Sequence, residues 1–151
     1  MSFEFIPATQ DDRAYLLSLR KLTMVEHLEN SGQYLSGAEH EIRLDDAYAC
    51  SHLIIFNSET IGTLKYQEDG CIVEIMQIQI HPDFQGQGLG KKVILQVLTK
   101  AKNKAVELTV LKDNPALKLY QRLGFIITGE DKFEYHLQAT KANRSPVSLI
   151  E

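Results

Sequence analysis

The alternation of apolar and polar residues predicts a short strand and then two helices at the start of the chain. Residues 2–8 alternate loosely and contain Pro7 near their end, which is typical of a short edge strand. After Thr9, a favourable N-cap, apolar residues recur at spacings of three and four as far as Asn30, where Asn-Ser-Gly supplies a helix stop. The more polar segment from about Gly37 predicts a second, less regular helix.

Three apolar runs separated by turn residues follow, and they predict an antiparallel meander. The runs extend over Cys50–Asn57, Ile61–Gln67 and Cys71–Ile80. The segments between them are rich in Asn, Ser, Asp and Gly, residues that favour tight turns between neighbouring strands.

The second half of the chain predicts a helix, a strand, a second helix and two strands. The first helix should bury Leu89, Val93, Ile94, Val97, Leu98 and Ala101, while Lys91, Lys92, Gln96, Lys100 and Asn103 should face away. The run Ala105–Leu111 predicts a strand, and the next helix should start at Asp113–Pro115 and end at Gly124. The last two strands, 125–128 and 133–137, should flank a turn at 129–131.

This order of elements predicts the fold class α+β, with a mixed, largely antiparallel central sheet flanked by helices. At 151 residues the chain fits one domain, which can bury roughly 70% of the surface that its unfolded form exposes. We expect this domain to span residues 1–138, because no linker or repeat divides them, and residues 139–151 to form a polar C-terminal tail.

The composition disfavours several function classes. A formal net charge of -4 argues against general nucleic-acid binding. No apolar stretch approaches ~18 residues and the first residues lack the regions of a signal peptide, so we expect no membrane partner and a cytoplasmic location. Cys50 and Cys71 lie in apolar runs rather than at metal-ligand spacing, and we expect them to be reduced, buried thiols.

The most informative stretch is the junction between the third meander strand and the following helix, Ile78–Lys91. It contains Gly86, Gly88 and Gly90, and glycine lets a backbone approach a ligand closely, while the N–H groups at a helix start favour an anion. The spacing fits neither the dinucleotide pattern, because Lys91 occupies the place of the third glycine, nor a Walker loop, which needs Ser or Thr after Gly-Lys. A helix start that needs only tight packing is the alternative.

This junction and a second segment resemble the GNAT superfamily of acetyl-CoA-dependent N-acetyltransferases. The family signature is Gln or Arg, two residues, Gly, one residue, then Gly or Ala, and Gln85–Gly90 matches it in full. The second segment, Asn114–Phe125, resembles the family's later element, with an Asn, an apolar helix face, a Tyr and a closing Gly-Phe. The resemblance covers residues 1–138, because the order of elements matches as well.

The resemblance implies a GNAT-like fold in which the strand Cys71–Ile80 splays from the next strand at the cofactor site. It also implies acetyl-CoA as co-substrate, with the pyrophosphate at the glycine turn and the pantetheine arm along the backbone before it. The residues implied to bind the cofactor are Ile78, Gln79, Ile80, Gln85, Gly86, Gln87, Gly88, Leu89, Gly90, Lys91, Asn114, Leu117 and Tyr120. We expect the side chains of Ile78 and Ile80 to belong to the core.

Two residues are candidates for the catalytic roles. The resemblance places the Tyr120 hydroxyl beside the sulfur, where a phenol can donate a hydrogen bond to the leaving thiolate; the alternative is a Tyr packed under the sheet. Glu74 stands where some relatives carry a glutamate base; the alternatives are a Glu in solvent or bonded to the neighbouring strand, and a water chain in place of a single base. Asn114 either bonds the pantetheine or only caps its helix.

The first two helices and the loop that joins them are expected to form the acceptor site. Glu26, Glu29, Glu39 and Glu41 would suit a cationic amine and Arg43 would suit a carboxylate, with solvated helix faces as the alternative for each. His27 and His40 lack any fixed geometry for a metal, and no metal is expected.

These features together predict an enzyme that transfers an acetyl group from acetyl-CoA to a primary amine of a small molecule or peptide by direct attack in a ternary complex. A non-catalytic module or sensor that binds coenzyme A with the same fold is the alternative. The identity of the acceptor does not follow from the sequence, and the protein is expected to be a monomer or a homodimer.

Overall fold

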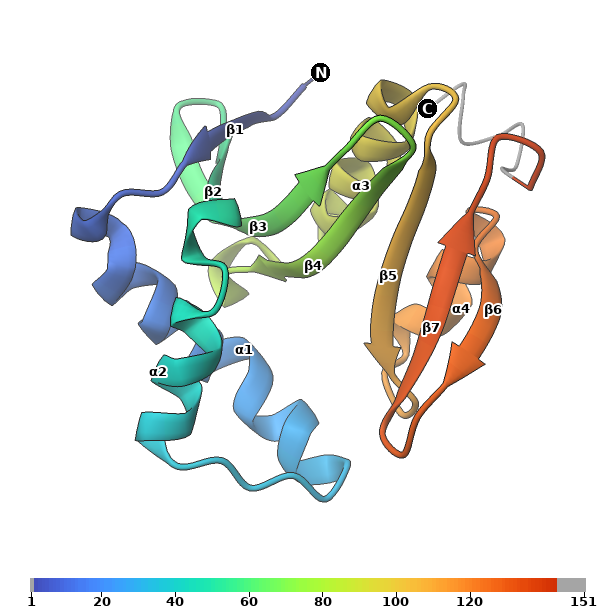
Figure 1. Ribbon diagram of the computed structural model, residues 1–151. Helices are drawn as coiled ribbons and strands as arrows, with labels where there is room; N and C mark the ends of the chain where they lie inside the picture. The colour runs from blue at the N-terminus through green and yellow to red at the C-terminus, as the bar shows by residue number, and fades with distance from the viewer. Residues whose placement is uncertain (1, 144–151) are drawn as a thin grey trace.

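The computed structural model describes residues 2–143, and its elements follow the predicted order (Figure 1). The strands are β1 (Glu4–Pro7), β2 (Ser51–Phe56), β3 (Glu59–Glu68), β4 (Ile72–Ile80), β5 (Ala105–Leu111), β6 (Ile126–Glu130) and β7 (Glu134–Ala139). The α-helices are α1 (Arg13–Asn30), α2 (Gly37–Asp45), α3 (Leu89–Ala101) and α4 (Ala116–Arg122). Within residues 2–143, every helix is too short or too polar to span a lipid bilayer.

The strands form one sheet in the order β1-β2-β3-β4-β5-β7-β6, and the predicted α+β fold class is confirmed. Every neighbouring pair is antiparallel except β4 and β5, which run parallel because α3 connects them across one face of the sheet. The predicted meander of three strands corresponds to β2, β3 and β4. The mixed sheet therefore consists of two antiparallel parts that meet at a single parallel pair.

The parallel pair is short, and the sheet opens beyond it. β4 and β5 are in register from Ile72 opposite Ala105 to Ile75 opposite Leu108, and the register ends there. In Figure 1 the two strands lie side by side at one end and diverge toward the other. The splay implied for the strand before the glycine turn is therefore present, and it frees one backbone edge of β4 after Ile75.

A β-bulge lies where β4 leaves its partner. In the pairing with β3, Lys65 lies opposite Gln77 and Tyr66 lies opposite Ile75, so Met76 is an extra residue on β4. Side chains alternate between the two faces of a strand, and one extra residue shifts that alternation by one position. Ile75 before the bulge and Ile78 after it therefore pack on the same face, against the core.

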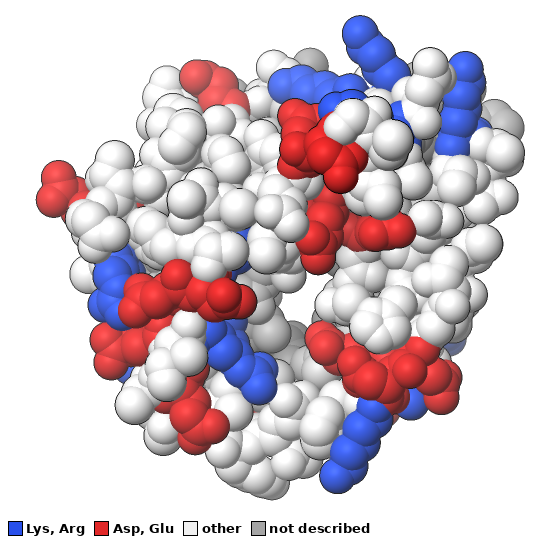
Figure 2. Space-filling model, in the orientation of Figure 1, with Lys and Arg blue, Asp and Glu red and all other residues white. Residues whose placement is uncertain are grey.

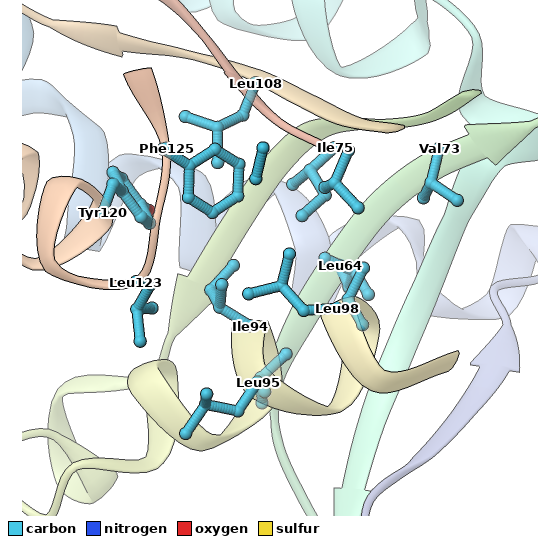
Figure 3. Packing of buried hydrophobic residues seen from close by; sticks show 14 of the residues in the cluster. Leu64, Val73, Ile75, Ile94, Leu95, Leu98, Leu108, Tyr120, Leu123 and Phe125 are labelled. Carbon is cyan, nitrogen blue, oxygen red and sulfur yellow. The ribbon is translucent and has the colours of Figure 1, made fainter. Parts of the chain in front are cut away.

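The core lies mainly between the sheet and α3. Figure 3 shows Ile94 and Leu98 of α3 directed toward Leu64 and Ile75 of the sheet. The stripe predicted for this helix is buried throughout, and Leu95 is buried as well. Gln96 differs from the prediction that it faces away, because its side-chain amide accepts from the Phe3 N–H (2.7 Å) and donates to the Phe3 carbonyl (2.8 Å).

Three smaller predictions need correction. Both cysteines are free, but Cys50 is half-buried and Cys71 is exposed, because each lies at a strand end rather than within the sheet. Residues 129 and 130 extend β6, whose register with β7 shifts at this point, so the turn lies later, around 131–133. β7 continues through Ala139, which is fully buried, and the part of the predicted tail after residue 143 lies outside the described residues.

β3 and β4 approach each other closely at Gly62, which leads to a stability prediction. An ideal Cβ on Gly62 would lie 2.0 Å from the Gln79 carbonyl oxygen, so the strands cannot keep their spacing around a methyl group. We expect Gly62→Ala to lower the free energy of unfolding by about 1–3 kcal/mol in urea denaturation, as overpacking does. Gly70→Ala is the matched control, because a Cβ on Gly70 would meet nothing within 4 Å. Equal stability of the two variants would contradict the close approach.

Candidate active site

A cavity of about 330 Å³ lies where the end of β4, the glycine turn, α3 and α4 meet. Its walls are apolar on the strand and helix sides and consist largely of backbone at the turn. The lining residues are Ile78, Ile80, Phe84, Gln85, Gly86, Gly88, Leu89, Gly90, Lys91, Ile94, Ala116, Leu119 and Tyr120. The two segments that carry the family resemblance therefore face one another across a single cavity.

The glycine turn presents open backbone to this cavity. Gly86 and Gly88 have φ angles of 80° and 72°, which favour glycine, and a Cβ on either residue would meet nothing within 4 Å. Gly88 is the N-cap of α3, and the first intrahelical bond runs from Lys92 N–H to Gly88 carbonyl (3.2 Å). The N–H groups of the preceding first turn, such as that of Gly90, have no acceptor within the helix. This is the arrangement that binds an anion at a helix N-terminus.

The free edge of β4 faces the same region. The His81 N–H donates to the Ile61 carbonyl of β3 (2.8 Å), and backbone groups in an antiparallel ladder alternate in direction from one residue to the next. The backbone groups of Gln79 therefore point to β3, and those of Ile78 and Ile80 point to the side that β5 has left. The Gln85 side-chain amide donates to the Ile80 carbonyl from that side (2.9 Å).

These contacts refine the roles predicted for five residues. Gln79 does not line the cavity; its side chain is 5% exposed on the opposite face, where its amide nitrogen has no partner among residues 2–143. Gln87 is exposed and also does not line the cavity, whereas Gln85 lines it and fixes the turn to β4. Ile78 and Ile80 pack against the core, as expected, and also contribute to the cavity wall.

Tyr120 lies on α4 with its side chain directed into the cavity region and the core. It is 9% exposed and forms an edge-to-face contact with Phe125, with ring centroids 5.7 Å apart. Figure 3 shows the two side chains near each other beside the core. Burial raises the pKa of the Tyr120 hydroxyl above its ordinary value, so the group remains protonated at neutral pH. Tyr120 is therefore packed under the sheet and also lines the cavity, and its role as a hydrogen-bond donor to the thiolate stays a prediction.

Asn114 and Leu117 serve mainly to build the start of α4. The Asn114 side-chain oxygen accepts from the Ala116 N–H (2.9 Å) and so fixes the start of α4, whose N-cap is Pro115, while a contact of Asn114 with the pantetheine stays a prediction. Leu117 packs against the core, and its neighbours Ala116 and Leu119 line the cavity in its place. The helix face toward the cavity is thus displaced from the residue that the resemblance indicated.

A second, larger cavity of about 600 Å³ lies on the other face of the splayed strands. Met76 and Gln77 of β4 line it, whereas Ile78 and Ile80, further along the same strand, line the first cavity. β4 is therefore a wall common to both. Figure 2 shows a hollow in the middle of this face, with acidic side chains above it and to its right and a mixed group of charges to its left.

The acidic side of the larger cavity comes from three strands. Glu74, Glu107 and Glu134 line it from β4, β5 and β7, and Glu74 and Glu107 are register partners in the parallel pair. Each carboxylate accepts a hydrogen bond: Glu74 from Gln67 (2.9 Å), Glu107 from Gln138 (2.9 Å) and Glu134 from Thr109 (3.5 Å). Glu74 is exposed and bonded to its neighbouring strand, which is one of the alternatives considered for it.

The opposite side of this cavity carries Arg20 of α1, Arg43 of α2 and Lys65 of β3. The Lys65 ammonium donates to the carbonyls of Arg43 (3.4 Å), Leu44 (3.3 Å) and Asp46, so its three N–H donors are used at the C-terminus of α2. A cation in this position also offsets the negative end of the helix dipole. Lys65 therefore holds the C-terminus of α2 against β3.

The acceptor residues predicted on α1 and α2 have mixed outcomes. Arg43 lines the cavity, but Glu39 caps α2 through Ser36 and Glu41 pairs with Arg13 (3.2 Å). Glu26, Glu29 and His27 also lie outside the cavity lining. His40 is buried and accepts from the Arg20 Nε–H (3.1 Å). Within residues 2–143 no three His, Cys, Asp or Glu side chains form a group that could hold a metal ion.

Several lining residues were not predicted, and only some of them leave a signal in the sequence. The phase shift from Val73 and Ile75 to Ile78 and Ile80 marks the bulge, and it could have placed Gln77 on the face opposite the isoleucines. Arg20 in an otherwise apolar helix face is a weaker signal. The carboxylates of β5 and β7 enter the cavity only through the order of strands in the sheet, which local patterns do not specify.

Comparisons with known proteins agree with this arrangement. A sequence profile described as "Acetyltransferase (GNAT) family" matches residues 16–125. The spermine/spermidine N(1)-acetyltransferase of Bacillus subtilis is 29% identical over 150 residues, covering 88% of this chain and 93% of that protein. An uncharacterized N-acetyltransferase ycf52 of Gracilaria tenuistipitata is 40% identical over 91 residues, covering 57% of this chain and 50% of that protein. The matches to the ycf52 proteins span half or less of those proteins' own length.

Solved structures share the fold at low sequence identity. The PaiA N-acetyltransferase of Thermoplasma acidophilum, solved in complex with coenzyme A, matches with a TM-score of 0.69 and 16% identity over 93% of this chain and 99% of that chain. An acetyltransferase of Thermus thermophilus matches with a TM-score of 0.71 and 16% identity, over 93% of this chain and 97% of that chain. These similarities establish the fold.

Proposed function

Because this chain belongs to the acetyltransferase (GNAT) family, we propose that it is an N-acetyltransferase that moves an acetyl group from acetyl-CoA to a primary amine by direct attack in a ternary complex. One observation carries the proposal: the free edge of β4, the open glycine turn and the buried Tyr120 line or border one cavity. A non-catalytic coenzyme A sensor would share that cavity but would not need the second one. No finding favours that alternative.

The residues of the smaller cavity fit coenzyme A in their chemistry. The first-turn amides after Gly88 can bind a pyrophosphate, and the backbone groups of Ile78 and the Ile80 N–H can pair with the amides of a pantetheine arm. Bound acetyl-CoA would supply the activated acetyl thioester. The open space at Gly86 and Gly88, where a side chain would otherwise project, leaves room for this group.

Tyr120 and Glu74 are the proposed catalytic residues. The Tyr120 hydroxyl has no hydrogen-bond partner among residues 2–143 and, because its pKa is raised, keeps its proton to stabilise a leaving thiolate. Glu74 lines the larger cavity and is exposed enough to take a proton from the acceptor ammonium, directly or through water. The β-bulge at Met76 comes directly after the Glu74–Ile75 pair on β4 and changes which side chains of this strand face each cavity.

The larger cavity is proposed as the acceptor site. Its three carboxylates, from β4, β5 and β7, would attract an ammonium group and raise its local concentration. The Bacillus subtilis relative acts on spermine and spermidine, as its name states, so an amine acceptor is consistent with both the charges and the family.

We expect acetyl-CoA to raise the Tm of the protein measurably. A ligand that binds only the folded state at a hundred times its Kd stabilises by about 2.7 kcal/mol, which for a domain of this size corresponds to roughly 5–10 °C. Thermal unfolding with and without acetyl-CoA checks this, with acetyl phosphate as the control that lacks the nucleotide and pantetheine. No shift with saturating acetyl-CoA would refute the cofactor assignment.

Thiol release from acetyl-CoA across a broad amine panel then tests transfer, and tight binding of acetyl-CoA without thiol release in the presence of any amine would favour the sensor.

A further inference from the structure

Arg20 is a buried cation without a carboxylate partner. It is 3% exposed, and no Asp or Glu side chain among residues 2–143 lies within 4 Å of its guanidinium. Its side chain donates from Nε to the His40 Nδ1 (3.1 Å) and from Nη1 to the Gln77 Oε1 (3.1 Å). Both partners are neutral: Gln77 is an amide, and burial and the nearby Arg20 lower the pKa of His40. A buried charge without a counter-charge is costly to a fold.

Arg20 lines the larger cavity and has N–H donors that its two hydrogen bonds do not use. A guanidinium has five N–H donors, and the two bonds to His40 and Gln77 leave three without a partner among residues 2–143. Arg20 lines the cavity that also contains the three carboxylates of the sheet. The exposed Arg43 lines the same side; within residues 2–143 its side chain forms no hydrogen bond or ion pair, and it interacts electrostatically with Glu39, one turn earlier on α2.

A purely structural role explains only part of this arrangement. Arg20 joins α1 to α2 through His40 and to β4 through Gln77, so it holds the acceptor cavity together. Two neutral hydrogen bonds need no charge, however, and the positive charge and the forked donors remain unexplained by that role. A forked guanidinium matches the geometry of a carboxylate, which accepts two parallel hydrogen bonds.

The larger cavity is therefore bipolar. Its carboxylates on β4, β5 and β7 suit an ammonium group, while Arg20 and Arg43 on α1 and α2 suit an anion, and Asp46 beside them lies near the already engaged Lys65. A polyamine would find the acidic side but would place positive charge against two arginines. A zwitterion would match both sides.

We propose that the acceptor is an amine that also carries a carboxylate, such as an amino acid, and that Arg20 binds this carboxylate with Arg43 adding positive charge from the exposed edge. This inference rests on the proposed N-acetyltransferase function. Arg20 then selects the acceptor, and the sheet carboxylates face the amine that is acetylated. The acetyl group passes from the thioester sulfur to the amine nitrogen, the amine loses one proton and the thiolate gains one.

The test compares L-amino acids with their C-terminal amides, which keep the side chain and the amine but replace the carboxylate by a neutral group. We expect kcat/KM for the acid to exceed that for its amide by about 10- to 100-fold, the range for a hydrogen-bonded charge. The amine of the amide is less basic, so a larger fraction of it is unprotonated and reactive at neutral pH. This difference favours the amide and therefore works against the expected preference for the acid. Putrescine and spermidine form a third arm that has no carboxylate.

Variants separate recognition from structure. Arg20→Gln should bring the acid-to-amide ratio close to one, whereas a loss of structure alone would lower both rates and leave the ratio unchanged. If Arg20→Gln does not fold, the exposed Arg43→Gln should reduce the ratio by about threefold, as expected for a weaker charge contact. Arg122→Gln, the same change on α4 outside both cavities, should leave the ratio unaltered.

Each outcome decides the inference. Amides or polyamines used as well as the acids, or a ratio unchanged in both arginine variants, would overturn the carboxylate assignment and leave the N-acetyltransferase proposal intact. No transfer to any amine, with acetyl-CoA still bound, would overturn both proposals together.

Discussion

Tyr120→Phe is expected to lower kcat by about 10²-fold while leaving the affinity for acetyl-CoA within about threefold of the original. The hydroxyl is the only group removed, and positioned proton donors contribute about 10²–10⁴-fold in rate. The ring remains, and with it the edge-to-face contact with Phe125 and the packing against the core. Steady-state thiol release measures kcat, and isothermal titration measures the acetyl-CoA Kd.

The fold of this variant should be preserved. The Tyr120 hydroxyl has no hydrogen-bond partner among residues 2–143, so its removal leaves no unsatisfied group in the described structure, and the unfolding free energy should change by about 1 kcal/mol or less. Tyr66→Phe is the matched control, because Tyr66 is a half-buried Tyr of β3 that lines neither of the two site cavities. An unchanged kcat in Tyr120→Phe would remove Tyr120 from the proposed role.

The dependence on Tyr120 should persist across neutral pH. Burial raises the pKa of its hydroxyl above the ordinary value of about 10, so the folded protein holds this proton more tightly than the unfolded chain does. The stability contributed by this group is therefore complete below pH ~10 and decreases only as the pH rises through the folded-state pKa. Loss of activity at neutral pH must then come from other groups.

Most of the fold followed from local patterns because each element has its own signal. The stripe of α3, the stop at Gly124 and the turn residues of the meander are properties of a few neighbouring residues, and the structure confirms them. The glycine turn was predicted for the same reason, since the strand, the turn and the helix start are contiguous. The motif Asn114–Phe125 then indicated the other wall of the cavity.

The larger cavity could not be predicted in this way because it depends on contacts between distant segments. Arg20 meets His40 and Gln77 across three elements, and Glu134 reaches the cavity because β7 inserts between β5 and β6. Single-residue signals on α2 were ambiguous, since Arg43 lines the cavity whereas Glu39 and Glu41 are used in a cap and an ion pair. Charge on a helix face becomes informative only when the packing of that face is known.

The bulge at Met76 shows how one residue on β4 divides the two functions of the site. It leaves Ile75 and Ile78 on one face and turns Gln77 toward Arg20 on the other. The strand can therefore present free backbone and apolar side chains to one cavity while it anchors a polar network in the other. Without the extra residue, Ile78 and Ile80 would point into the larger cavity.

Gly88→Asp is expected to weaken acetyl-CoA binding by about 10²-fold or more. A side chain on Gly88 would enter open space at the N-terminus of α3, so its carboxylate would occupy the place proposed for the pyrophosphate and repel it. Loss of one charged hydrogen bond alone accounts for about 10- to 100-fold. Fluorescence or calorimetric titration with acetyl-CoA measures the change, and Gly88→Asn separates the bulk of the side chain from its charge.

Gly32→Asp controls for backbone strain in this experiment. Gly32 follows α1, has a φ of 87° against 72° for Gly88, and a Cβ on it would also meet nothing within 4 Å. Both variants should lose about 1–2 kcal/mol of stability from the left-handed backbone, a loss that the favourable N-cap position of Asp partly offsets at Gly88, while only Gly88→Asp loses the ligand. If Gly88→Asp bound acetyl-CoA as tightly as Gly32→Asp, the helix N-terminus would not be the anion site, and the cavity between β4 and α4 would have to hold the cofactor by its apolar wall alone.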